Sequence, residues 1–256
     1  MTDLFGQGGH QVRLDWGPTG AVVARADIAV VVDVLSFSTS VTVAVERGMR
    51  VYPYRWRDER AGEYAASRDA VLAVGRLEAA RSGATPAPSL SPAGLLRCAP
   101  APRLVLPSPN GSTIAAALAG AGSRVVVGCL RNARAVARWL VPELDAGHSV
   151  VVVAAGERWT EDDSLRPALE DHLGAGAVVS ALAATGHGSG LSPEARAAAE
   201  LFDVARTTLT ERLRDCVGGR ELYAKGFGAD VDVAAAFDVC DVVPVLEDEA
   251  FAATSR

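Results

Sequence analysis

Short apolar runs rich in valine alternate along this chain with stretches of helical periodicity. The run DIAVVVDVL at 27–35 predicts a buried strand, and residues 39–48 after it predict a helix. The same pattern predicts a short helix at 58–68 and further strands at 50–56, 70–75, 103–108, 123–129 and 148–156. Strands separated by helical stretches indicate βαβ units, whose right-handed crossovers place helices on both faces of a sheet. We therefore expect an α/β fold around a mostly parallel sheet, with a mixed sheet as the alternative.

The second half of the chain is mainly helical in pattern. Residues 166–185 have apolar positions at helical spacing, and Ser192 is a predicted N-cap with Pro193 at the first helical position. A short helix and a final strand are expected within 231–246. We expect one domain over 1–256, with a proline-rich excursion at 76–102 that is either a functional loop or an ordinary surface loop.

Composition excludes several classes of protein. With 256 residues, 49% of them hydrophobic and 22% charged, the chain can bury a substantial core. The net charge is -6, the basic residues are all arginine except Lys225, and no basic stripe with aromatics is present, so nucleic acid is not an expected partner. We identify no signal peptide, and the longest nearly uncharged apolar run, 173–185, is too short for a bilayer.

The cysteines agree with a protein of the cytoplasm. Cys98, Cys129, Cys216 and Cys240 lack close pairing and CxxC spacing, which predicts buried thiols in a reducing compartment. The expected location is therefore cytoplasmic, away from membranes. The sequence leaves the oligomeric state open, a homodimer being one alternative.

The turns that follow the predicted strands are unusually polar. In open parallel sheets, ligands bind beyond the carboxyl ends of the strands. In SPNGS, Asn110 precedes Gly111, where the backbone can approach a ligand closely, and Ser112 can cap the next helix. Free amides at a helix start suit an anion, although an ordinary tight turn with an N-cap explains the same residues.

Acidic residues occur at or after two of these strands. Asp33 lies at the end of a buried strand, Glu157 occupies a comparable position, and Glu170 and Asp171 begin a long helix. A buried carboxylate is costly unless it is paired or bound to a metal. These acids could hold Mg²⁺ together with water and phosphate oxygens; each alone could equally be a cap, an ion-pair partner or a solvated side chain.

Several familiar catalytic motifs are absent from the sequence. It contains no G-x-x-x-x-G-K-[ST], no G-x-G-x-x-G after a strand and no G-x-S-x-G elbow. Cys129 and Arg134 are one residue too close for a Cys-x₅-Arg phosphatase loop, and the four histidines form no metal-spaced motif. His172, next to the acidic pair, is expected on a helix surface.

Seven segments, in this order, resemble the 2-phosphosulfolactate phosphatase family: VVDVLSFSTSVTVAVERG, LSP at 90–92, SPNGS, GCLRNARAVA, AAGE, LEDHLGAGAVVSAL and GRELYAKGFGADVDVAAAFD. The resemblance covers roughly residues 12–245. It implies a three-layer α/β/α sandwich and Mg²⁺-dependent hydrolysis of a small phosphorylated acid, 2-phosphosulfolactate, to sulfolactate and phosphate in coenzyme M biosynthesis.

The resemblance also implies roles for individual residues. It makes Asp33, Glu157 and Asn132 the catalytic candidates, and Asp33, Glu157, Glu170 and Asp171 the metal candidates. The candidates for holding the phosphate or a second anionic group are Ser38, Thr39, Asn110, Gly111, Ser112, Arg131 and Arg220, with Arg134 as a further arginine. The nucleophile is a water on the metal or, alternatively, Asp33.

The chain departs from the family pattern in the first motif. Ser36 and Phe37 occupy positions where the family usually has an arginine and a small residue. An arginine offers a charged fork to phosphate or sulfonate, whereas serine offers one neutral hydroxyl. Two alternatives therefore stay open: a phosphatase of the same family with a different substrate, and a homologue that binds an anion without catalysis.

Overall fold

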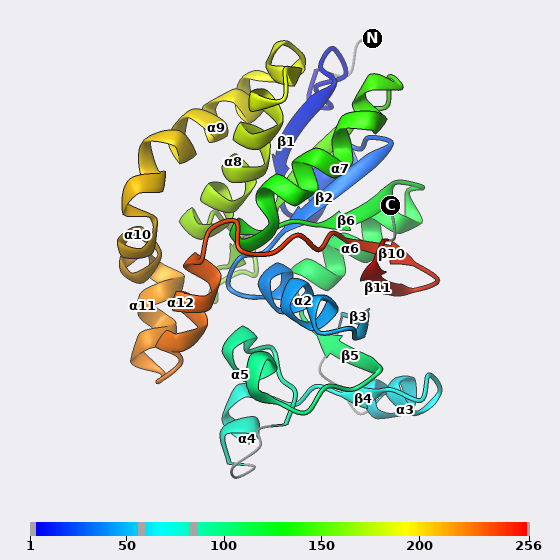
Figure 1. Ribbon diagram of the computed structural model, residues 1–256, viewed down its shortest axis with the longest axis vertical. Coiled ribbons are helices and arrows are strands. Elements are labelled where there is room, and N and C mark those ends of the chain that lie inside the picture. The colour runs from blue at the N-terminus through cyan, green and yellow to red at the C-terminus, as the bar shows by residue number, and fades with distance from the viewer. Residues whose placement is uncertain (1–3, 56–59, 82–86, 255–256) are drawn as a thin grey trace.

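The computed structural model describes residues 4–55, 60–81 and 87–254, which build a three-layer α/β/α sandwich (Figure 1). Its central sheet has nine strands in the order β1-β7-β2-β6-β10-β11-β3-β5-β4, and β8 and β9 form a separate two-stranded sheet. The strands are β1 Val12–Trp16, β2 Ile28–Val32, β3 Arg50–Tyr54, β4 Val71–Leu72, β5 Arg103–Pro107, β6 Arg124–Val127, β7 Val150–Ala154, β8 Glu157–Arg158, β9 Leu165–Arg166, β10 Pro244–Glu247 and β11 Ala250–Ala253.

Helices cover both faces of the sheet. The α-helices are α1 Gly17–Val23, α2 Phe37–Glu46, α3 Arg60–Ala66, α4 Arg76–Ala80, α5 Pro92–Arg97, α6 Gly111–Gly120, α7 Ala133–Asp145, α8 Leu169–Ala184, α9 Pro193–Ala205, α10 Leu209–Asp215, α11 Val217–Ala224 and α12 Gly228–Ala235. Short 3-10 turns lie at η1 Leu130–Asn132, η2 His187–Gly190 and η3 Arg206–Thr208. None of the helices in the described ranges is long and apolar enough to cross a membrane.

The alternation of side chains along β2 explains the two apolar layers. Ile28, Val30 and Val32 belong to a core cluster with α7, α8 and α9, whereas Ala29 and Val31 belong to a cluster with α2 and α6. Successive residues of a strand point to opposite faces, so a strand with helices on both sides is apolar throughout. All five residues of β2 are buried, as are all five of β7.

An antiparallel hairpin divides the sheet into two parallel groups. Strands β1, β7, β2 and β6 run parallel to one another, and so do β3, β5 and β4. Between the groups, β10 pairs antiparallel with β6 and β11 pairs antiparallel with β3. The sheet is therefore mixed, which was the alternative that the sequence left open.

Most expected elements are present, with some differences at weak patterns. The expected strands at 27–35, 123–129 and 148–156 correspond to β2, β6 and β7, and Ser192 caps α9 by accepting a hydrogen bond from Ala195 N at 3.1 Å. The strand expected at 70–75 is reduced to the two residues of β4. The excursion at 76–102 contains α4 and α5, and its residues 82–86 lie outside the described ranges, as do 56–59.

Candidate active site

Asp33 joins the turn after β2 to the turn after β5. Its Oδ1 accepts a hydrogen bond from Phe37 N at 2.9 Å, at the start of α2, and its Oδ2 accepts one from Gly111 N at 3.0 Å, at the start of α6. These two turns come from the two different parallel groups of the sheet. Five steps of the sheet separate β2 from β5, so the side chain of Asp33 connects turns that follow distant strands.

Asp171, in the first turn of α8, joins the ends of β2 and β7 in a similar way. Its Oδ1 accepts from Val34 N at 2.7 Å and its Oδ2 accepts from Gly156 N at 2.8 Å. Acidic residues in the first turn of a helix also interact favourably with the positive end of the helix dipole. Asp171 therefore fixes the position of α8 relative to the two strand ends that carry Asp33 and Glu157.

Glu170 and Glu157 complete a group of four carboxylates. Glu170 is buried against α11, where a Cβ added at Gly218 would overlap its Oε1 and lie 3.2 Å from its Cδ, so glycine is needed for this close approach. Glu157 begins β8, and its Oε2 accepts a hydrogen bond from Asn110 Nδ2 at 3.0 Å. Two of the acids thus follow β2 and β7, and the other two come from one turn of α8.

Burial and mutual repulsion raise the pKa values of Asp33, Glu157 and Asp171. Burial, which disfavours the charged form, raises the pKa of Asp33 to about 6 and that of Glu157 to about 7, with the charge of Asp33 adding to the effect on Glu157. The pKa of Asp171 is also raised, first by burial and then by the charge of Asp33. The group therefore favours a proton or a cation.

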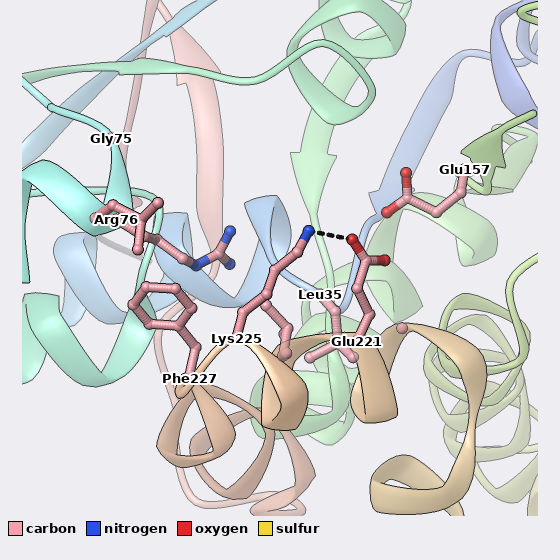
Figure 2. A pocket seen from close by; sticks show the side chains of 10 residues that line it. Leu35, Gly75, Arg76, Glu157, Glu221, Lys225 and Phe227 are labelled. Atoms are coloured by element: carbon pink, nitrogen blue, oxygen red, sulfur yellow. Dashed lines mark hydrogen bonds and ion pairs between the residues drawn. The ribbon is translucent and has the colours of Figure 1, made fainter. Parts of the chain in front are cut away.

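Cavities open beside two of the four acids. Asp33, Asn110 and Glu157 line a cavity of about 420 Å³. Glu157 also lines a neighbouring cavity of about 430 Å³, shown in Figure 2, and Leu35 and Arg76 border both. Glu170 and Asp171 border neither of these cavities. Asp33 and Glu157 are therefore the carboxylates of the group that a ligand in these cavities can reach.

The predicted hydroxyl residues at the start of α2 have structural roles. Ser38 Oγ accepts from Asp33 N at 2.8 Å and donates to Val31 O at 3.0 Å. Thr39 Oγ1 donates to Val34 O at 2.7 Å. Both side chains are fully buried. The structure places them beneath the turn that carries Asp33, with their hydroxyls bonded to the backbone.

Asn132 and Arg131, in η1 after β6, are not brought to the four acids. Asn132 is fully buried; its Oδ1 accepts from Cys129 N at 2.9 Å, and its Nδ2 donates to Val242 O at 3.0 Å. Arg131 lies 3.5 Å from Glu46, the last residue of α2. Because α2 has ten residues, its two ends are roughly 13–15 Å apart, and the residues that bond Asp33, Phe37 and Ser38, lie in its first turn.

Two other predicted anion contacts also lie elsewhere. Arg220 is exposed on α11 and does not border either cavity, and Arg134 forms an exposed ion pair with Asp238 at 3.0 Å. The Gly111 amide already donates to Asp33, so it is engaged with a carboxylate in this structure. The hydroxyl of Ser112 is buried and has no hydrogen-bond partner among the described residues, which leaves it available at the start of α6.

Two cationic residues at the cavity of Figure 2 were not predicted, and Arg55, also not predicted, borders the cavity that contains Asp33. Arg76 begins α4, and Lys225 lies at the end of α11; both border the cavity of Figure 2. Two signals in the sequence point to them. Arg76 follows a predicted strand directly, in the same kind of position as the other strand-end turns, and Lys225 is the only lysine of the chain.

The acidic group has donor atoms of the kind that bind a divalent metal ion. The donors are carboxylate oxygens, the type that Mg²⁺ prefers, and each oxygen of Asp33 accepts a single hydrogen bond and retains a lone pair. Within the described residues no group of three or more His, Cys, Asp and Glu side chains is arranged to hold a metal. Mg²⁺ usually binds through one or two carboxylates with water and phosphate oxygens, so the pair Asp33 and Glu157 fits that ion.

A mixed α/β/α sheet with a carboxylate group and cavities at its strand ends has the architecture of an α/β enzyme. The chain belongs to the 2-phosphosulpholactate phosphatase family, whose model matches residues 20–249 of the 256. It is accordingly a phosphoric monoester hydrolase of that type. A search of curated proteins finds no match to the chain.

Proposed function

We propose that this protein is a Mg²⁺-dependent phosphatase of a small phosphorylated acid, with 2-phosphosulfolactate as the leading substrate and coenzyme M biosynthesis as the setting. The observation that supports this most is the convergence of four carboxylates, of which Asp33 and Glu157 have raised pKa values and border open cavities. Four carboxylates in one buried place favour a cation, and family membership supports phosphate ester hydrolysis.

Asp33 and Glu157 would hold Mg²⁺ because they are the members of the group that border the cavities. When bound, the ion would polarise a phosphoryl oxygen and activate a water for attack. Asn110 orients Glu157 through its 3.0 Å hydrogen bond, and Ser112 offers a hydroxyl at the start of α6. Asp171 keeps the ends of β2 and β7 together, which holds the two ligands in position.

The nucleophile in this proposal is water. Both oxygens of Asp33 accept hydrogen bonds from backbone amides, which stabilises the charged, ligating form of this carboxylate. Direct attack by Asp33 is the alternative, and an Asp33-phosphate detected by mass spectrometry after acid quench would support it instead. The four buried, unpaired cysteines support a reducing compartment, in agreement with a cytoplasmic enzyme.

The decisive experiment is Asp33→Asn in a phosphate-release assay with and without Mg²⁺. The amide keeps the size of the side chain and an acceptor for Phe37 N but removes the charge, so we expect turnover to fall by about 100-fold or more. Asp27→Asn is the matched control. Asp27 precedes β2, whereas Asp33 follows it, so Asp27 lies at the opposite end of the strand, where it accepts hydrogen bonds from Ser149. Wild-type turnover in Asp33→Asn, or full activity in excess EDTA, would contradict the proposal.

A different substrate within the family is the second candidate. Ser36, at the position where an arginine is usual, accepts a hydrogen bond from Arg76 Nη2 at 2.6 Å. The charge beside Asp33 therefore comes from another segment of the chain, which changes the shape of the cavity. Comparing turnover of 2-phosphosulfolactate with that of other small phosphorylated acids distinguishes the two candidates.

A further inference from the structure

The cavity shown in Figure 2 has acidic and cationic groups at different parts of its wall. Glu157 and Glu221 contribute acidic groups, and Arg76 and Lys225 contribute cationic groups. In Figure 2, the guanidinium of Arg76 and the ammonium of Lys225 lie at one cavity but come from different elements, α4 and the end of α11, and the ammonium points toward Glu221. Each cation has a carboxylate partner, Asp230 for Arg76 and Glu221 for Lys225.

Arg76 is held rigidly in this position. Its Nε donates to Asp230 Oδ2 at 3.0 Å and its Nη2 donates to Ser36 Oγ at 2.6 Å. Asp230, 1% exposed, is itself fixed by Ser91 Oγ at 2.5 Å and Ala93 N at 3.0 Å. Among the residues that the structure describes, Nη1 of Arg76 has no hydrogen-bond partner, and the side chain is 18% exposed. Part of a preorganised fork therefore remains free for a ligand.

Lys225 is held only weakly. Its Nζ forms an i,i+4 ion pair with Glu221 Oε1 at 2.5 Å, and its side chain is 60% exposed. Exposed pairs of this kind contribute little to stability. An anion in the cavity can therefore replace Glu221 as the partner of the ammonium at little cost.

The cationic part of the wall adjoins the phosphate end of the site. Arg76 and Leu35 border both the cavity of Figure 2 and the one that contains Asp33. A substrate whose phosphate lies at Asp33 and Glu157 therefore directs the rest of its small acid skeleton toward Arg76 and Lys225. An anionic substituent there can bind the free Nη1 of Arg76 and take the place of Glu221 at the Lys225 ammonium.

We propose that Arg76 and Lys225 form the subsite for the second acidic group of the substrate, a carboxylate or sulfonate that is not the phosphate. The subsite rests on the proposed function for its reaction, but its binding of an anion does not depend on turnover. It replaces the predicted contacts with Arg131, Arg134 and Arg220, which the structure places elsewhere. Ser36 matters here as the acceptor that positions the Arg76 fork.

The kinetic test uses two phosphate esters of matched size, phosphoglycolate and ethyl phosphate, which differ in carrying a carboxylate or a methyl group. In Lys225→Gln and Arg76→Lys we expect KM for phosphoglycolate to rise about 10- to 100-fold, while KM for ethyl phosphate changes much less. Arg76→Lys keeps a cation opposite buried Asp230, so folding is preserved. Equal changes for both esters, or none, would overturn the subsite.

Arg138→Gln is the matched control. Arg138 forms an exposed ion pair with Asp241 at 2.6 Å, and its side chain is 58% exposed, close to the value for Lys225. This variant should leave both KM values unchanged. A rise in KM for phosphoglycolate in the control would mean that general surface charge, and not the subsite, sets the affinity.

A second measurement needs no catalysis. Because the chain has one lysine, N-hydroxysuccinimidyl acetate labels Lys225 and the terminal amine, and peptide mass spectrometry separates the two. Sulfoacetate, which carries two acidic groups and no phosphate, should protect Lys225 saturably in wild type, and at about 10-fold higher concentration in Arg76→Lys. Absent protection overturns the subsite even in an active enzyme, whereas protection in an inactive protein supports the subsite and contradicts only the phosphatase proposal.

Discussion

Phe37 illustrates how one residue connects the fold to the site. Its ring packs on Gly111, where an added Cβ would overlap the ring and lie 2.9 Å from Phe37 Cβ. It also makes an edge-to-face contact with Phe251, with centroids 6.1 Å apart. Its backbone amide donates to Asp33. The unusual phenylalanine at this position therefore fills a space between α2, α6 and β11, and does not enter the cavities beside Asp33.

The same contact predicts the effect of Gly111→Ala. The new methyl group would meet the Phe37 ring and push α6 away from Asp33, so we expect a loss of about 1–3 kcal/mol in the free energy of unfolding, measured by urea denaturation. Gly120→Ala, in the same helix with nothing within 4 Å of its Cβ, should instead be neutral or slightly stabilising. Equal stability of the two variants would argue against the close packing.

At the scale of elements, Asp230 holds three helices together. It lies in the first turn of α12, binds Ser91 and Ala93 at the start of α5, and pairs with Arg76 at the start of α4. The proline-rich excursion is thus attached to α12 through one buried carboxylate. Both interpretations of this excursion from sequence treated it as a loop, whereas part of it borders the site.

Replacing Asp230 should loosen the excursion. In Asp230→Ala, the Arg76 guanidinium and the Ser91 hydroxyl lose a buried partner, which we expect to cost about 3 kcal/mol. Hydrogen exchange should accelerate at 76–81 and 87–97 and stay unchanged in β7. Asp232→Ala, in the same helix but in an exposed pair with Arg214, should cost less than about 1 kcal/mol. If exchange at 76–81 and 87–97 were no faster in Asp230→Ala than in Asp232→Ala, this role of Asp230 would be contradicted.

The elements also show which parts of the molecule the sequence could predict. Valine-rich β2, β6 and β7 were predicted because a strand buried on both faces has a continuous apolar pattern. Strands β1 and β11 were not predicted: β1 carries Arg13 and Asp15, and β11 reads AFAA, which has few β-branched residues. The glycine- and proline-containing α1 was missed for a comparable reason.

For the site, the position of a residue after a predicted strand identified the turns that converge. The sequence did not show in which direction each side chain points. Asp33, Glu157, Glu170 and Asp171 converge because their turns lie at neighbouring strand ends. Asn132 occupies the same kind of turn, yet its amide points into the structure and bonds the backbone near β10. Arg76 and Lys225 border the same cavity only because α4, α5, α11 and α12 pack together. No local sequence pattern predicts that packing.

At the scale of the whole molecule, the buried acids should make stability depend on pH and on metal. Folding raises the carboxyl pKa values of Asp33 and Glu157 to about 6 and about 7. The folded protein therefore binds protons more tightly than the unfolded chain, and this contribution, greatest below the unfolded pKa values, is lost as the pH rises through 6 and 7. Above that pH range, and without a divalent cation, no bound metal ion offsets the repulsion between the ionised carboxylates.

In EDTA we expect the melting temperature to fall by roughly 5–10 °C between pH 5.5 and pH 8, measured by scanning calorimetry. Added Mg²⁺ should raise it more at pH 8 than at pH 5.5, because a cation and protons compete for the same carboxylates. The double variant Asp33→Asn, Glu157→Gln should have a flatter profile. A melting temperature that rises toward pH 8 in EDTA would contradict the burial of uncompensated acids.

The hairpin between the two parallel groups has a consequence for how the protein is made. Strands β10 and β11 come later in the chain than the nine other described strands, yet they occupy the centre of the large sheet. Until residues 244–253 have left the ribosome, β6 and β3 each present an unpaired edge to the cell. The turn that carries Asp33 follows a strand of one group, and Gly111 follows a strand of the other. The nascent chain can therefore complete its reaction centre only after the last of these strands has been synthesised and inserted.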